Sequence, residues 1–121
     1  MATVLIVDDS PTELHVMQEM LARNGFETLT AEDGDDARVQ AERHSPDVIL
    51  MDVVMPGTNG FQATREISRN PQTAEIPIII ISSKDQETDR IWGMRQGATE
   101  YMTKPVKEKE LVQKIRSVVA G

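Results

Sequence analysis

Short apolar runs alternate with longer amphipathic stretches along the chain. Nearly continuous aliphatic runs occupy residues 3–7, 47–52 and 76–81, and such runs are typical of strands buried on both faces of a parallel sheet. Apolar and polar residues alternate over 26–30, which predicts a strand nearer the sheet edge. Residues 100–103 are a candidate for a short last strand.

Helical segments fill the intervals between these runs. The first is expected after Ser10, because Ser10 suits the N-cap, Pro11 the first helical position and Glu13 the closing position of a capping box. Asn24 and Gly25 supply its stop signal. The other four helices are predicted around 37–41 before Pro46, over 61–67 after Asn59 and Gly60, over 85–96, and over 107–120.

The alternation amounts to a βα unit repeated five times, which predicts an α/β fold in one domain spanning residues 1–121. Links of this length between parallel strands imply right-handed crossovers, with helices on both faces of the sheet. Ligands of such sheets bind at the carboxyl ends of the strands. The residues that follow each strand are therefore the first place to look for chemistry.

The composition of the chain excludes several classes of function. A net charge of -7 argues against non-specific nucleic-acid binding, which needs a basic surface. The chain has no Cys, so disulfides, cysteine-ligated zinc and thiol catalysis are excluded. No apolar run approaches the roughly 20 residues that span a bilayer, and the N-terminus lacks the basic segment of a signal peptide. We therefore expect a cytoplasmic domain that does not insert into membranes.

Polar residues with complementary chemistry follow four of the predicted strands. Asp8 and Asp9 follow the first strand, Asp52 ends the third, Ser82 ends the fourth, and Lys104 follows the fifth. Because parallel strands present their carboxyl ends at one edge, we expect these side chains to converge.

Three carboxylates that lie close together need positive charge nearby to offset their mutual repulsion. Two like charges about 4 Å apart repel by about 4 kcal/mol at an effective dielectric of 20. A lysine offsets one charge, and Mg²⁺, which prefers oxygen ligands, offsets more. A carboxylate supported in this way can attack a phosphoryl group. Each residue alone has a simpler interpretation, as a solvated turn, a helix cap or a loop, so the prediction rests on their shared edge.

The motifs around these residues resemble the receiver domain of two-component response regulators. The matching segments are Val4–Ser10, Pro46–Asp52, Met55–Gly60, Ile78–Ser83 and Gly97–Pro105. The resemblance implies a flavodoxin-like, doubly wound five-stranded parallel sheet with strand order 2-1-3-4-5. It also implies a stand-alone regulator of the chemotaxis type. Segments 9–13, 59–65 and 83–89 are most similar to regulators of type IV pilus twitching motility.

The resemblance implies a role for each acidic residue. Asp52 would be the phosphoacceptor. Asp9 would bind Mg²⁺ directly and Asp8 mostly through water, with Asp52 and the backbone carbonyl of Val54 as further ligands. Val54 and Lys84 occupy the two variable positions that flank the phosphoryl group in this family.

The remaining roles concern the switch and its partners. Lys104 would contact the phosphoryl group, and its bond to Pro105 is expected to be cis. Ser82 would be the switch hydroxyl, and Tyr101 the aromatic residue that moves with it. The resemblance implies a histidine kinase of the CheA kind as phosphodonor. It also implies a downstream protein partner on the face made by the fourth helix, fifth strand and fifth helix.

These observations favour a signalling switch that acts on no external substrate. One alternative is a small magnesium-dependent phosphohydrolase with an aspartate nucleophile, although Val54 stands where such enzymes usually place a second acid. Another alternative is a binding module that is never phosphorylated. Trp92, the only tryptophan, is either a packing residue or a partly exposed anchor on the output surface.

Overall fold

The computed structural model describes residues 2–55, 57 and 59–119. Five parallel strands form one sheet in the order β2-β1-β3-β4-β5. The strands are β1 (Thr3–Val7), β2 (Glu27–Ala31), β3 (Val48–Met51), β4 (Ile78–Ser82) and β5 (Glu100–Thr103). The helices are α1 (Pro11–Ala22), α2 (Gly34–His44), α3 (Gly60–Arg69), α4 (Glu87–Arg95) and α5 (Glu108–Val119). The predicted fold class and strand order are confirmed.

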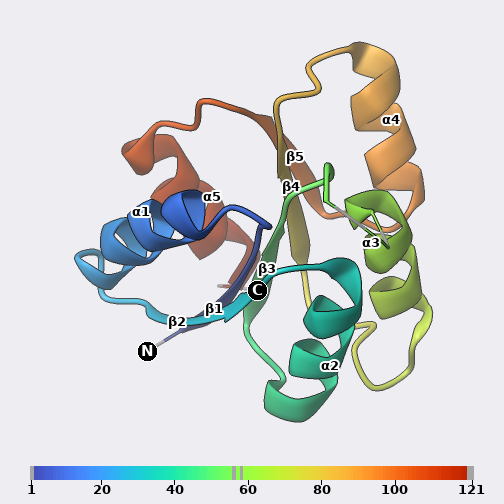
Figure 1. Cartoon of the computed structure of the whole chain (residues 1–121), viewed down its shortest axis with the longest axis horizontal. Helices are drawn as coiled ribbons and strands as arrows, with labels where there is room; N and C mark the ends of the chain where they lie inside the picture. Colours follow the sequence, from blue (N-terminus) through green and yellow to red (C-terminus); the bar gives the residue numbers. More distant parts are fainter. Residues whose placement is uncertain (1, 56, 58, 120–121) are drawn as a thin grey trace.

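Helices cover both faces of the sheet (Figure 1), with α1 and α5 on one side and α2, α3 and α4 on the other. Alternate residues of each central strand enter opposite cores. Leu5 and Ile49 pack with residues of α2 and α3, whereas Ile6 and Leu50 pack with residues of α1 and α5. Burial on both faces is the physical reason for the continuous apolar runs in the sequence.

Several element boundaries differ from the sequence expectation. β4 begins at Ile78 rather than at residue 76, after Pro77, which has no N–H for a sheet ladder. Helix α4 begins at Glu87 rather than at residue 85, because Gln86 is its N-cap and pairs with Asp89 in a capping box. The first and last strands have the predicted bounds.

The expected capping box at the start of α1 is only half formed. The Ser10 hydroxyl accepts a hydrogen bond from the Glu13 N–H at 3.3 Å, as expected. The Ser10 N–H, however, donates to Asp8 Oδ1 at 2.9 Å. The Glu13 carboxylate extends to Lys104 instead. The prediction that Glu13 closes the box is therefore wrong, because Asp8 satisfies the donor that Glu13 was expected to bind.

Two parts of the sequence predictions lie outside the described residues. They are Pro56 and Thr58, within the segment Met55–Gly60, and the predicted end of the last helix at residue 120. Within residues 2–55, 57 and 59–119, no helix combines the length and apolar character needed to cross a bilayer.

Candidate functional site

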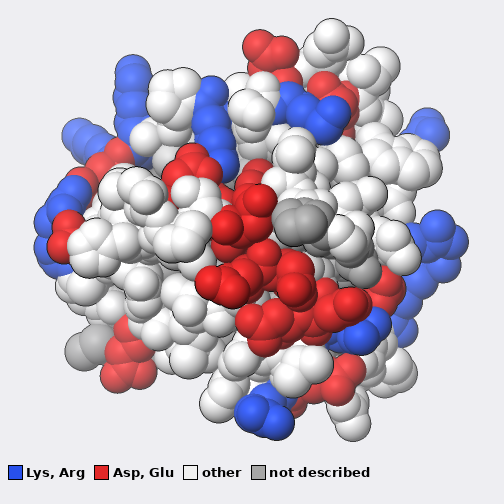
Figure 2. Space-filling model, in the orientation of Figure 1, with Lys and Arg blue, Asp and Glu red and all other residues white. Residues whose placement is uncertain are grey.

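Three carboxylates meet at the carboxyl ends of the neighbouring strands β1 and β3. The backbone N–H of Asp52 donates to the Val7 carbonyl at 3.0 Å, which fixes Asp52 beside the end of β1. One oxygen each from Asp8, Asp9 and Asp52 lies within 4.8 Å of the others. Asp8 and Asp52 are buried, with 7% and 8% of their surface exposed, and Asp9 is exposed. Figure 2 shows acidic side chains gathered across the middle of this face.

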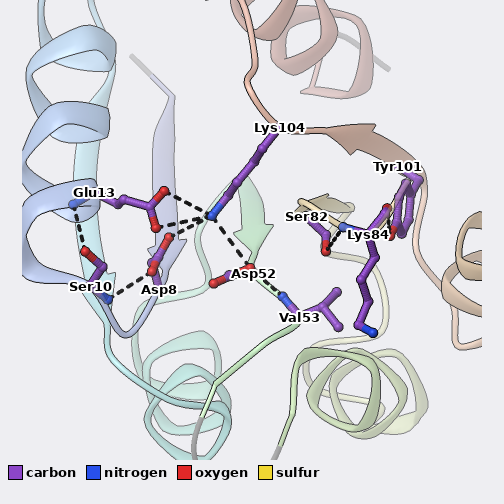
Figure 3. A network of polar contacts seen from close by, with 9 residues as sticks. All are labelled: Asp8, Ser10, Glu13, Asp52, Val53, Ser82, Lys84, Tyr101 and Lys104. Atoms are coloured by element: carbon purple, nitrogen blue, oxygen red, sulfur yellow. Dashed lines mark hydrogen bonds and ion pairs between the residues drawn. The ribbon is translucent and has the colours of Figure 1, made fainter. Parts of the chain in front are cut away.

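Lys104 extends from the end of β5 into this group (Figure 3). Its Nζ lies 3.4 Å from Asp8 Oδ2 and 3.7 Å from Asp52 Oδ1. Both oxygens of Glu13, on the first turn of α1, lie 3.3 Å from the same nitrogen. The Lys104 N–H donates to the Ser82 carbonyl at 2.8 Å, and the bond to Pro105 is cis, as predicted.

The Asp52 carboxylate has two different oxygens. Oδ1 accepts a hydrogen bond from the Val53 N–H at 2.8 Å and faces Lys104. Among the described residues, no hydrogen bond reaches Oδ2. Burial, with smaller contributions from Asp8 and Glu13, raises the pKa of Asp52, and the opposing effects of Lys104 and Val53 do not cancel this increase. The site therefore holds a buried carboxylate whose negative charge is only partly compensated.

The charge of Lys104 is reinforced by its surroundings. Burial by itself lowers the pKa of Lys104, but the attraction of Asp52, Asp8 and Glu13 outweighs burial, so this pKa lies above its ordinary value. The side chain is therefore a fixed ammonium at neutral pH. It compensates one of the carboxylates around it and leaves a net negative pocket.

This donor set fits a hard divalent cation. Mg²⁺ prefers carboxylate, carbonyl and water oxygens in an octahedron, and is usually held by one or two carboxylates plus waters. Asp8, Asp9 and Asp52 supply the carboxylates, and Asp9 faces solvent, where water ligands are available. The raised pKa of Asp52 indicates that added positive charge would be favourable there.

Ser82 and Tyr101 both contact the backbone of Lys84. The Ser82 hydroxyl, fully buried at the end of β4, accepts a hydrogen bond from the Lys84 N–H at 3.1 Å. The Tyr101 hydroxyl, on β5, donates to the Lys84 carbonyl at 2.7 Å. The first residues of the β4–α4 loop are thus tied to both predicted switch residues (Figure 3).

The family model described as "Response regulator receiver domain" matches residues 4–116. The chain belongs to this family. The receiver is 54% identical to Protein PilH of Pseudomonas aeruginosa, over all of both chains. It spans only 26% of the response regulator PleD of Caulobacter vibrioides and 51% of the phosphate regulon transcriptional regulatory protein PhoB of Escherichia coli.

Two solved structures are similar to this chain over nearly its whole length. The receiver domain of the sensor histidine kinase PA1611 from Pseudomonas aeruginosa has a TM-score of 0.92 and 32% identity, covering 99% of this chain and 98% of that one. That structure holds a magnesium ion in its active-site cleft. The chemotaxis protein CheY4 of Vibrio cholerae has a TM-score of 0.91 and 31% identity, covering 98% of both chains. Receiver domains bind Mg²⁺ in an acidic pocket, and this receiver has the corresponding cluster.

The sequence predicted that Asp8, Asp52 and Lys104 gather at one edge of the sheet, but it did not predict that Glu13 joins them. The feature that could have predicted this contact is the position of Glu13 in the first turn of α1, beside the strand end that carries Asp8 and Asp9. The capping-box interpretation gave that carboxylate another partner. An apolar groove of about 390 Å³ between α1 and the segment after β5, lined by Met17, Met20 and Val106 among others, also begins beside Lys104 and was not anticipated.

Trp92 is half exposed, as the anchor interpretation requires. The groove it lines, of about 650 Å³, is shared with the α3 residues Phe61, Arg65 and Arg69, among others. No described residue of β5 or α5 lines this groove. Trp92 therefore borders a groove between α3 and α4.

Proposed function

We propose that this receiver is a phosphorylation-controlled signalling switch and that Asp52 is its phosphoacceptor. One observation carries the proposal: the buried Asp52 carboxylate lies within 4.8 Å of two other acids and 3.7 Å from the Lys104 ammonium. Receivers are signalling proteins rather than enzymes with external substrates, and the proposal gives this chain catalysis only of its own phosphorylation and dephosphorylation.

The proposed chemistry assigns each side chain a task. An Asp52 oxygen attacks phosphorus, the P–N bond of a donor phosphohistidine breaks, and the electron pair leaves with the imidazole nitrogen. Lys104 binds the oxygens of the transferred group. Asp8, Asp9, Asp52 and the Val54 carbonyl hold Mg²⁺, which supplies positive charge for the transition state when bound.

The proposed output begins at the Lys84 backbone. Movement of Ser82 toward the acyl phosphate breaks the hydrogen bond from the Lys84 N–H, which is now 3.1 Å long. Tyr101, bonded to the carbonyl of the same residue, then repacks and alters the surface of α4, β5 and α5. A downstream protein partner reads that surface, and a histidine kinase of the CheA kind supplies the phosphoryl group.

The phosphohydrolase alternative receives no support from the site. Its second acid would stand at position 54, where this chain has a valine with 59% of its surface exposed. The alternative of a binding module that is never phosphorylated is not favoured either, since the three acids lie within 4.8 Å of one another and Lys104 pairs with Asp8 and Asp52.

Phosphoryl transfer from acetyl phosphate tests the proposal. Incubation with Mg²⁺ should add one phosphoryl group to the intact protein by mass spectrometry, and Asp52→Asn should abolish the addition. Tandem mass spectrometry after borohydride reduction should locate the modified aspartate. Phosphorylation of the Asn variant at the wild-type rate would show that Asp52 is not the acceptor.

The similarity to PilH supports a role in type IV pilus twitching motility, in the cytoplasm. Deleting the gene in its source organism should change the twitching zone, and the wild-type gene should restore it. The Asp52→Asn gene should fail to restore it. Normal twitching in the deletion strain would assign the protein to another pathway. Cell fractionation tests the proposed cytoplasmic location.

A further inference from the structure

Glu13 stands in an unusual relation to Lys104. Three carboxylates among the described residues lie within 4 Å of the Lys104 nitrogen. Two of them, Asp8 and Asp52, belong to the proposed cation site. The third belongs to Glu13, which contributes no atom to the acidic cluster and has both oxygens 3.3 Å from the ammonium.

The local structure leaves the Glu13 side chain available for this contact. Glu13 occupies the position from which a capping-box glutamate binds the N-cap N–H. Asp8 Oδ1 already accepts that N–H from Ser10 at 2.9 Å. The Glu13 carboxylate therefore extends across the site entrance to Lys104, as Figure 3 shows.

The distances indicate a balance among the carboxylates. Lys104 Nζ lies 3.3 Å from Glu13, 3.4 Å from Asp8 and 3.7 Å from Asp52, so Glu13 shares the ammonium with both cation-site carboxylates. Glu13 is half exposed, whereas Asp8 and Asp52 are buried. Glu13 thus attracts the ammonium toward the entrance, away from the carboxylates that a cation would bind.

We propose that Glu13 is a positioning residue, which draws Lys104 toward the entrance so that the ammonium competes less strongly with Mg²⁺ for Asp8 and Asp52. The inference rests on the proposed function, since it concerns the same cation site. Without Glu13, Lys104 moves against Asp8 and Asp52 and offsets their charge. The affinity of the site for Mg²⁺ then falls.

Two substitutions separate position from charge. Glu13→Gln removes both the contact and the charge. Glu13→Asp keeps the charge but shortens the side chain by one C–C bond, about 1.5 Å, so the carboxylate no longer reaches Lys104. Glu19→Gln is the matched control, because Glu19 lies on the same helix and pairs with His15 instead.

Mg²⁺ affinity is measured by titration with the metal alone, followed through backbone amide chemical shifts. We expect both Glu13 variants to bind Mg²⁺ about three- to tenfold more weakly than wild type, as an ammonium shifted by about 1 Å would produce. Glu19→Gln should keep wild-type affinity. In a Lys104→Met background, Glu13→Asp should have no effect, because the competing ammonium is gone.

Other outcomes overturn the inference. Wild-type affinity in Glu13→Asp would mean that Glu13 acts only through its charge. An equal loss with and without Lys104 would mean that the substitution alters the start of α1. If the wild type binds Mg²⁺ and accepts a phosphoryl group while every Glu13 variant has unchanged affinity, this inference fails and the proposed function stands. If the wild type binds no Mg²⁺, both fail.

Discussion

The charge of Asp52 is the least favourable feature of the site when no cation is present. Its carboxylate is 8% exposed and lies within 4.8 Å of two other acids. Lys104 and the Val53 N–H compensate part of this charge, yet the pKa of Asp52 stays above its ordinary value. The Asp52 charge, which the proposed phosphoryl chemistry needs, therefore lowers the stability of the fold at neutral pH.

Asp52→Asn should raise the free energy of unfolding in metal-free buffer at pH 7 by about 1 kcal/mol, once attraction to Lys104 is set against repulsion from Asp8. The folded state holds the Asp52 proton more tightly than the unfolded state, because burial raises the folded pKa. This contribution is present in full below the ordinary pKa of 3.8 and is lost as pH rises through the folded pKa. The advantage of the Asn variant should therefore grow over that interval.

Urea unfolding at a series of pH values measures this difference. Glu75→Gln, at an exposed position in the α3–β4 connection, controls for the general loss of one negative charge. An Asn variant less stable than wild type at pH 7 would show that the Asp52 charge is favourable in the folded protein.

Added Mg²⁺ should stabilise the wild type through the three clustered acids. A ligand that binds only the folded state at ten times its Kd stabilises by about 1.4 kcal/mol. Asp9→Ala should remove that gain, since Asp9 is the exposed member of the cluster and is expected to bind the ion directly. Thermal unfolding with and without Mg²⁺ measures the effect. An unchanged gain in the alanine variant would place the metal elsewhere.

Among the secondary-structure elements, the contact between α3 and the end of β3 positions Asp52. Gly60 is the first residue of α3, and its N–H donates to the Val53 carbonyl at 3.0 Å. A Cβ at position 60 would lie 2.0 Å from the Asp52 carbonyl oxygen and 2.7 Å from Val53 Cα. The glycine thus permits a close approach of two backbones.

Gly60→Ala should destabilise the protein by about 2–3 kcal/mol, because backbone atoms cannot yield as side-chain ends do. It should also slow phosphorylation, because α3 must move away from Asp52, the proposed phosphoacceptor. Gly25→Ala is the contrasting variant: its Cβ meets nothing within 4 Å, but its φ of +87° is strained for alanine. That variant should cost about 1 kcal/mol and leave phosphorylation unchanged. Equal phosphorylation rates in the two variants would contradict this account of Gly60.

Across the whole molecule, the site and the α3–α4 groove are connected through α4. Gly93 lies beside Trp92, and a Cβ there would meet Tyr101 at 3.1 Å and Phe61 at 3.3 Å. Tyr101 in turn is bonded to the Lys84 carbonyl. A rearrangement of Tyr101 is therefore expected to shift the packing of α4 as a population change between two states.

Trp92 fluorescence should report that change. Beryllofluoride with Mg²⁺, a mimic of the phosphorylated state, should alter its intensity or its quenching by iodide. As the only tryptophan, Trp92 gives an unambiguous signal. Ser82→Ala should weaken the response without preventing beryllofluoride binding at Asp52. Identical emission and quenching in both states, with binding shown independently, would mean that activation does not reach the α3–α4 groove.

The sequence by itself determined the fold class and most of the site. Continuous apolar runs require burial on both faces, and the intervals between them require crossover helices, so the parallel order of elements follows. Asp8, Asp52 and Lys104 were predictable because each follows a strand, and parallel strands end at one edge.

Only the tertiary structure decided which contacts those residues make. By sequence rules Glu13 accepts a hydrogen bond from the Ser10 N–H, yet Asp8 accepts it instead and leaves Glu13 to contact Lys104. The sequence left Trp92 as either a packing residue or a partly exposed anchor, and the structure shows it half exposed beside α3. The sequence placed Gly60 just before the third helix, whereas it is the first residue of α3 and permits a close approach of two backbones. Competition for one donor and the separation of two backbones depend on residues distant in the sequence, which no local pattern specifies.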